Sequence, residues 1–286
     1  MADMNRRLWL LVVLMLGVSI SFGSTATSVN EKESNMTKTQ LAADLAEVRQ
    51  CRILFSHHSV GANIIMGIRR LDTENSGGSH IRVASLEVAA ASKGPMLIEY
   101  SGGENGWPKS KIDSFSATIR GETRLKPELA FMKFCYADFD PQTDVAEVFN
   151  YYRSSIEALK REHPEIRFAH TTVPLTVWPT GVKSRVKRLI GREVWEDMSN
   201  VKRAEFNRRL KEYFKSDPIF DISLIEATAP DGQLTTFKLG GQIYPSLYPG
   251  YASDDKGHLN TMGQQVAGEA FIRFIAEGLK GRNSSR

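Results

Sequence analysis

The sequence predicts an α/β domain, with a parallel sheet of about five strands between two layers of helices (a three-layer α/β/α sandwich). Two observations predict it. Short apolar segments alternate with longer segments whose apolar residues recur every three to four positions, which is the period of a helix. The short segments are almost continuously apolar, as strands are when helices cover both faces of a parallel sheet. The chain of 286 residues shows no internal repeat, so we expect one domain over residues 46–286.

The first 26 residues have the pattern of a secretory signal peptide. Two arginines precede an apolar run over residues 8–22, and small residues follow at 23–26. The run is short for a membrane span, which needs about 20 apolar residues, and an uncleaved N-terminal anchor is the alternative. The polar residues 27–45 are expected to form a flexible lead-in. We therefore expect a secreted or periplasmic protein that keeps no stable membrane span after cleavage.

Strands and helices are then expected to alternate along the domain. Strands are predicted where short β-branched or aromatic runs are bounded by polar residues, over 52–56, 81–86, 129–135, 166–170 and 218–222. Helices are predicted where apolar residues keep the helical period, over 61–71, 109–119, 143–162, 196–215 and 260–279. In the third helix Val145, Phe149, Tyr152, Ile156 and Leu159 form one apolar face.

The two cysteines are expected to be buried thiols. Cys51 begins the first predicted strand and Cys135 ends the third. Parallel strands would put the two thiols at opposite edges of the sheet, beyond the distance that a disulfide can bridge. Export alone would have permitted a disulfide.

The charge pattern is only mildly basic. A formal net charge of +4 indicates weak attraction to anionic partners. The densest basic run covers residues 183–192, where we expect a solvated helix face or a contact with an anionic glycan. Nucleic acid is the less favoured alternative, so no nucleic-acid partner is expected.

Polar clusters follow three of the predicted strands, at residues 57–59, 135–138 and 170–172. Functional groups in parallel sheets gather at the carboxyl ends of the strands, so these clusters are expected to face one crevice. On this reasoning His58, Asp138 and His170 are candidate substrate-lining residues.

Three residues have the chemistry of a serine hydrolase. Asp255 and His258 lie three positions apart before the last predicted helix, so that the carboxylate can hold the imidazole by its Nδ1 proton. Ser59 lies on the turn between the first strand and the first helix, where His258 Nε2 could take its proton. The simpler interpretations are that Ser59 caps the helix and His258 is a surface residue. Asp254 is the alternative acid.

This arrangement resembles the SGNH/GDSL hydrolase superfamily, in which the nucleophilic serine follows the first strand and an Asp-x-x-His motif precedes the last helix. Residues 255–258 (DKGH), followed by Leu259, Asn260 and Gly263, are similar to that closing motif. The resemblance implies a flavodoxin-like SGNH fold and an esterase that needs neither cofactor nor metal.

The chain departs from the pattern of this superfamily at two places. The Gly-Asp-Ser-Leu motif is replaced by residues 57–60 (HHSV), and Ala137 stands where the oxyanion-binding asparagine is expected. Loss of one such donor costs roughly 10²–10³ in rate. The expected oxyanion hole consists of the backbone N–H of Ser59 together with Gly106 and its neighbour Asn105.

The remaining polar residues near the crevice are interpreted more simply. His57 and His58 point to opposite faces of an extended segment, so a shared metal is not expected. One of them is expected to pack beneath the sheet and the other to line the crevice. Lys109 and Lys111 are expected to be solvent charges, with contact to an anionic substrate as the alternative.

The long connections 176–195 and 229–251 are expected to shape the substrate site. The second carries Tyr244, Tyr248 and Tyr251, which suit stacking on a sugar ring, although packing of the loop against the domain would explain them equally well. Together with export, they favour a carbohydrate ester as substrate, with acetyl as the acyl group. The alternatives are an acyltransferase acting on a glycan and a non-catalytic glycan-binding relative. The sequence does not specify the oligomeric state.

Overall fold

The computed structural model describes residues 38–279. The predicted signal peptide and residues 27–37 lie outside this range. Residues 1–40 form a unit separate from residues 41–286, and only residues 38–40 of it are described, as helix. In the second unit residues 41–48 are helical, and Leu41, Leu45 and Val48 are buried in the core. The expected flexible lead-in is therefore already ordered helix at its C-terminal end.

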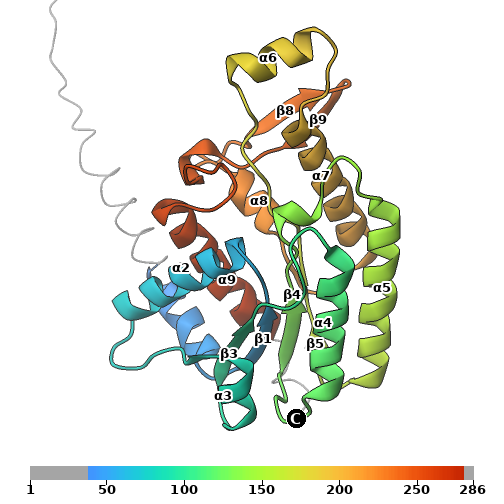
Figure 1. Cartoon of the computed structure of the whole chain (residues 1–286). Helices are drawn as coiled ribbons and strands as arrows, with labels where there is room; N and C mark the ends of the chain where they lie inside the picture. The colour runs from blue at the N-terminus through green and yellow to red at the C-terminus, as the bar shows by residue number, and fades with distance from the viewer. Residues whose placement is uncertain (1–37, 280–286) are drawn as a thin grey trace, which may run out of the picture. The chain divides into compact units, whose positions relative to one another are not determined.

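A five-stranded parallel sheet lies at the centre of the domain (Figure 1). Its order is β2–β3–β1–β4–β5, and every neighbouring pair is parallel. The strands are β1 (Arg52–Ser56), β2 (Val83–Ala84), β3 (Met96–Tyr100), β4 (Leu129–Met132) and β5 (Arg167–Phe168). The predicted fold class is confirmed.

Helices cover both faces of this sheet. Because successive strand residues point to opposite faces, Ile53 and Phe55 pack with one helical layer and Leu54 with the other. The first layer contains α2 (Val60–Glu74) and α9 (Thr261–Leu279). The second contains α4 (Pro108–Gly121), α5 (Val145–Glu162) and α7 (Trp195–Tyr213). The five predicted helices correspond to these five.

Several shorter elements were not predicted or have different bounds. Strand β3 was missed, and the predicted strand 81–86 is reduced to β2 because α3 (Leu86–Ala90) begins there, with the Ser85 side chain capping its Val88 N–H. The predicted strand 129–135 ends at Met132. The predicted strand 166–170 splits into β5, paired with β4, and β6 (His170–Thr171), which pairs with β7 (Ile219–Phe220). The remaining elements are α6 (Val182–Leu189), α8 (Ile222–Ala227), β8 (Thr236–Leu239), β9 (Gln242–Pro245) and the 3₁₀ turns η1 (Tyr136–Asp138) and η2 (Pro249–Tyr251).

Helices α2 and α9 touch through glycine. A Cβ on Gly67 would lie 1.9 Å from the Gln264 carbonyl oxygen, and one on Gly268 would lie 2.7 Å from the Gly67 carbonyl carbon. The two backbones are therefore in direct contact. This contact matters for the site, because Ser59 immediately precedes α2 and His258 lies shortly before α9.

The two cysteines have the surroundings that the sequence predicted. Cys51 and Cys135 are both buried and form no disulfide with each other.

Within residues 38–279, no helix is both long and apolar enough to cross a bilayer.

Candidate active site

Ser59 lies on a strained turn at the carboxyl end of β1. Its φ of 57° and ψ of −111° fall in a region that side chains other than glycine rarely adopt. The turn is closed by hydrogen bonds from Gly61 N–H to the His58 carbonyl and from Ala62 N–H to the Ser59 carbonyl, at 3.0 and 2.8 Å. The Ser59 side chain makes no capping bond to α2, so capping does not explain this serine.

His258 approaches Ser59 from the other end of the chain. Its Nε2 lies 2.5 Å from Ser59 Oγ, and its Nδ1 is hydrogen-bonded to Asp255 Oδ2. The other Asp255 oxygen accepts hydrogen bonds from Ser253 Oγ and from the backbone N–H groups of Gly257 and His258. The order Ser–His–Asp needed for proton transfer is therefore present in the geometry.

These contacts keep Asp255 ionised. Partial burial alone would raise the pKa of its carboxyl, but the hydrogen bonds from His258, Ser253 and Gly257 outweigh it and hold the pKa well below its usual range. It is Asp255, and not the alternative Asp254, that hydrogen-bonds His258 Nδ1. Asp255 is thus the carboxylate that holds the imidazole.

The Asn63 side chain connects helix α2 to the turn that carries His258. Asn63 on α2 accepts a hydrogen bond from the backbone N–H of Leu259 through its Oδ1, at 3.0 Å. The turn that carries His258 is thereby fixed to the first turns of the helix that follows Ser59.

Tyr136, which the sequence did not single out, borders both Ser59 and His258. Its ring meets the His258 ring edge-on at 5.6 Å between centroids, and its hydroxyl lies 3.4 Å from His258 Nδ1. The nearby Ser59 side chain acts to lower the pKa of that hydroxyl. A Cβ on Gly257 would lie 2.7 Å from Tyr136 Cζ, so a side chain at this position would displace the ring. Burial, followed by the charge of Asp255, raises the pKa of the Tyr136 hydroxyl, which therefore remains a proton donor.

The expected oxyanion loop is held by a buried ion pair. Lys111 Nζ contacts Asp138 Oδ2 at 2.6 Å, and both side chains are almost completely buried. Asp138 also accepts hydrogen bonds from the N–H groups of Gly106, at 2.8 Å, and Cys135, at 2.6 Å. Lys111 is thus no solvent charge, and Asp138 does not line the crevice.

This network changes the roles available to the two oxyanion candidates. The Gly106 N–H already donates to Asp138, so it does not serve the crevice. The amide oxygen of the exposed Asn105 accepts from Lys111 Nζ at 2.8 Å, which leaves its NH₂ group as the possible donor. Lys109 is at the surface and pairs with Glu147.

The two adjacent histidines have different surroundings. His57 is buried, lies against Phe55 and hydrogen-bonds Glu99 at 3.0 Å, and burial lowers its pKa. Gly61 lacks the side chain that would collide with the His57 ring. His58 is half-buried and donates through Nε2 to the Gly102 carbonyl at 3.0 Å.

His170 does not reach the crevice. It is fully buried, stacks on Phe214 at 3.8 Å, and bonds the Tyr152 hydroxyl and Asp217. It belongs to the core beneath α5 and α7, because Tyr152 of α5 and Phe214 at the end of α7 enclose its ring.

The expected tyrosine platform is mostly packed. Tyr251 is buried and Tyr248 lies against it edge-on at 5.0 Å, while Tyr244 packs on Phe237. Packing of the loop against the domain therefore explains these residues better than stacking on a sugar.

A cavity of about 690 Å³ opens beside Asp255 instead. Part of its lining comes from the connection 176–195, which was expected to shape the substrate site. Its aromatic lining includes Tyr136, Phe139, Trp178 and Trp195. Trp195 is 53% exposed, and the indole Nε1 of Trp178 is buried without a hydrogen-bond partner among the described residues.

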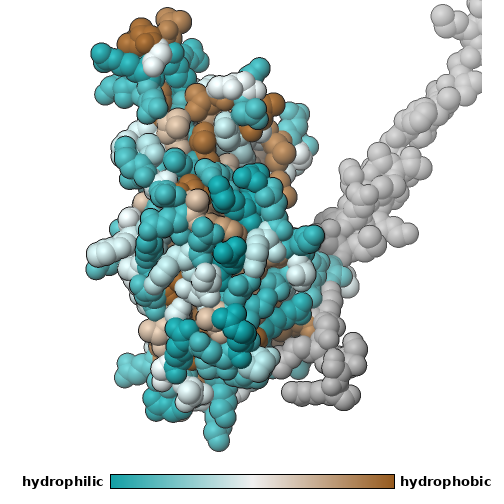
Figure 2. Space-filling view, turned by 90° about the vertical axis from the view of Figure 1, so that its right-hand side faces the viewer, coloured by the Kyte–Doolittle hydropathy of each residue, from teal (hydrophilic) through white to brown (hydrophobic). Residues whose placement is uncertain are grey.

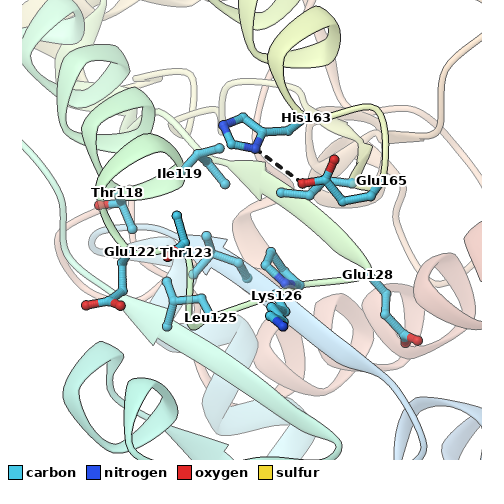
Figure 3. A pocket seen from close by; sticks show the side chains of 12 residues that line it. Thr118, Ile119, Glu122, Thr123, Leu125, Lys126, Glu128, His163 and Glu165 are labelled. Carbon is cyan, nitrogen blue, oxygen red and sulfur yellow. Dashed lines mark hydrogen bonds and ion pairs between the residues drawn. The ribbon is translucent and has the colours of Figure 1, made fainter.

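A second cavity, of about 390 Å³, lies at the other edge of the sheet (Figure 3). It is lined by residues that precede β4 and β5 and by the C-terminal turns of α4, with His163 and Glu165 on one side. Because these positions mark the amino ends of parallel strands, this cavity is remote from Ser59. Among residues 38–279, no group of three or more histidine, cysteine or acidic side chains is placed to hold a metal ion.

No family model and no curated protein match the sequence. Solved structures similar to the chain include a lipase/acylhydrolase from Enterococcus faecalis, at 14% identity and a TM-score of 0.45, covering 79% of this chain and 95% of that one. A GDSL-like lipase from Parabacteroides merdae has 15% identity and a TM-score of 0.46, covering 81% of this chain and 97% of that one. An acetylxylan esterase from Geobacillus stearothermophilus has 11% identity and a TM-score of 0.41, covering 79% of this chain and 94% of that one. At identities of 11–15%, these similarities concern the fold alone.

Proposed function

We propose that the chain is a serine ester hydrolase in which Ser59 is the nucleophile, His258 the general base and Asp255 the group that orients the imidazole. The observation that carries the proposal is the continuous path from Ser59 Oγ through both nitrogens of His258 to a carboxylate held ionised by four hydrogen bonds. The strain at Ser59 supports it, because a capping serine has no need of that conformation.

The first half of the reaction forms an acyl-enzyme. Ser59 Oγ attacks the ester carbonyl carbon while its proton moves to His258 Nε2, and the carbonyl oxygen becomes an oxyanion. The C–O bond to the leaving alcohol then breaks, and His258 returns the proton to that alcohol. Water repeats the sequence on the acyl-enzyme and releases the acid.

The oxyanion needs donors to replace the missing asparagine. We assign this role to the backbone N–H of Ser59, the Tyr136 hydroxyl and the NH₂ group of Asn105. The Tyr136 hydroxyl lies beside Ser59 and 3.4 Å from His258 Nδ1, and we propose that it can donate to an oxygen on the carbon that Ser59 attacks. The bond from Lys111 fixes the Asn105 amide without using its donors.

An acetylated carbohydrate in an exported setting is the proposed substrate. Its support now lies in the cavity beside Asp255, where the exposed Trp195 offers an aromatic face for a sugar ring. Trp178 stacks on Phe237 and lies next to the Arg188 guanidinium, so less of its surface is open to a sugar than that of Trp195.

The first test is hydrolysis of p-nitrophenyl acetate by the wild type, Ser59→Ala and His258→Ala. We expect both variants to lose at least about 10³-fold in kcat, because each removes a member of the proton path. Ser79→Ala and His80→Ala, on the surface near the far end of α2, are the matched controls and should keep wild-type rates. Equal rates in all five proteins would contradict the proposal.

The two alternatives give different outcomes. A glycan-binding relative with an inert serine would not react with a fluorophosphonate probe at Ser59. An acyltransferase would react with the probe, but would turn over ester faster in the presence of a sugar acceptor than in water alone.

A further inference from the structure

Helix α6 projects from the domain (Figure 1). None of its eight residues is buried. Four large apolar side chains in and just after it are exposed: Val182 by 78%, Val186 by 49%, Leu189 by 87% and Ile190 by 58%. In the space-filling view they form an apolar tip at the top of the molecule (Figure 2). Such exposure on neighbouring residues is unusual for a surface that faces only water.

The apolar residues lie on one face of the helix. Val182, Val186 and Leu189 are spaced by four and three residues, and Ile190 is adjacent to Leu189. The opposite face holds the helix to the domain: Arg188 contacts Asp197 at 2.6 Å and lies 4.4 Å above the Trp178 ring. The apolar face therefore points away from the domain.

Basic residues border this face on both sides. At about 100° per residue, Lys183 lies on one flank and Arg185 on the other, and Arg192 follows shortly after the helix. All three are exposed. An apolar stripe with cationic flanks is the arrangement of a helix that lies in the interface of an anionic bilayer.

We propose that α6 docks the protein on an anionic phospholipid surface, with Val182, Val186, Leu189 and Ile190 in the interface and Lys183 and Arg185 against the headgroups. A second copy of the chain is a poorer occupant, because two such faces would bring their cationic flanks together. A soluble polyanion would pair with the flanks but would leave the apolar tip in water.

Docking would also orient the proposed ester site, and in this it goes beyond the proposed function. Thr180 and Gly181, which lead into α6, line the cavity that Asp255 and Tyr136 also border. With α6 in the interface, this cavity would lie close to the lipid surface, which suits an ester carried by a membrane-anchored molecule.

The test is co-sedimentation of the purified protein with vesicles of phosphatidylcholine alone or with 30% phosphatidylglycerol, about a third of the lipid being anionic. We expect binding to the anionic vesicles only, weakened by added salt. Val186→Ser/Leu189→Ser should reduce the partition coefficient at least tenfold. The matched control is Val88→Ser/Leu224→Ser, which changes an exposed valine and an exposed leucine elsewhere.

The charge contribution is tested in the same way. Lys183→Gln/Arg185→Gln should lower binding by about tenfold or more, since each cation near an anionic surface contributes roughly fivefold. Arg161→Gln/Lys215→Gln removes the same net charge from an exposed site elsewhere and should have little effect.

Several results would overturn the proposal. The first two are equal binding to neutral and anionic vesicles and unchanged vesicle binding by the α6 variants. The others are concentration-dependent dimers that Val186→Ser/Leu189→Ser abolishes, or binding to dextran sulfate that Val186→Ser/Leu189→Ser leaves unchanged. The Ser59→Ala protein should bind vesicles as the wild type does. A failure of docking is therefore separable from a failure of the proposed catalysis.

Discussion

Replacing Tyr136 by phenylalanine removes one oxygen atom from the candidate site and nothing else. The ring can keep its place between Gly257 and His258, because phenylalanine has the same shape. What is lost is the hydroxyl near Ser59 and His258 Nδ1.

The size of the effect follows from the kind of bond removed. A hydrogen bond to a charged group contributes about 1.5–3 kcal/mol, which corresponds to roughly 10- to 150-fold in rate. Complete loss of an oxyanion donor costs about 10²–10³. Because Tyr136 is only half-buried, water can partly replace its hydroxyl, and we expect a fall in kcat of about 10- to 100-fold.

The assay is the initial rate of p-nitrophenyl acetate hydrolysis, with kcat and KM determined separately. KM should change little, since the bond strengthens only as the oxyanion forms. Tyr151→Phe on α5 is the matched control, because its exposed hydroxyl bonds only Asp113 among the described residues. A kcat for Tyr136→Phe within twofold of the wild type, at unchanged thermal stability, would refute the assignment.

Two further predictions concern carboxylates. Asp255→Asn should lower kcat by about 10³–10⁴-fold because the amide cannot stabilise the imidazolium, whereas Asp254→Asn should stay near wild type; similar losses in both would show that the acid is misassigned. Burial raises the pKa of Glu226 to about 8, although its bond from Leu175 N–H and the charges of Lys133 and Arg203 oppose this. The folded protein then keeps a proton that the unfolded chain loses near pH 4.3, so stability falls between about pH 5 and pH 8 by up to about 1.4 kcal/mol per pH unit. Glu226→Gln should flatten that slope in denaturant titrations at pH 5.5, 6.5 and 7.5, and an unchanged slope would contradict the shift.

Local sequence patterns predicted the elements that span many residues. The five long helices appear at the expected places, because an apolar face that repeats over several turns has few other interpretations. Ser59, Asp255 and His258 were also recognisable, since each occupies a turn next to a strongly patterned helix. Strand β3 was missed because five residues (MLIEY) carry too little periodicity to be told from a loop.

The remaining differences arise from contacts between distant parts of the chain. Asp138 turned inward because Lys111, 27 residues earlier, reaches it from α4. Tyr136 became part of the candidate site because a glycine more than a hundred residues later leaves space for its ring. No spacing within a single segment reports either contact.

The glycine contact between α2 and α9 sets how closely the two helices approach each other, and thereby the alignment of the candidate site. Gly67 follows Ser59 by eight residues, so the crossing lies about 12 Å along α2 from the nucleophile. A methyl group added at Gly67 or Gly268 would push the two helices apart, and we expect the distance between Ser59 and His258 to increase. A variant changed only there would behave as a catalytic lesion while every reacting side chain was still present. Loss of activity in such a variant would measure the alignment of the site rather than its chemistry.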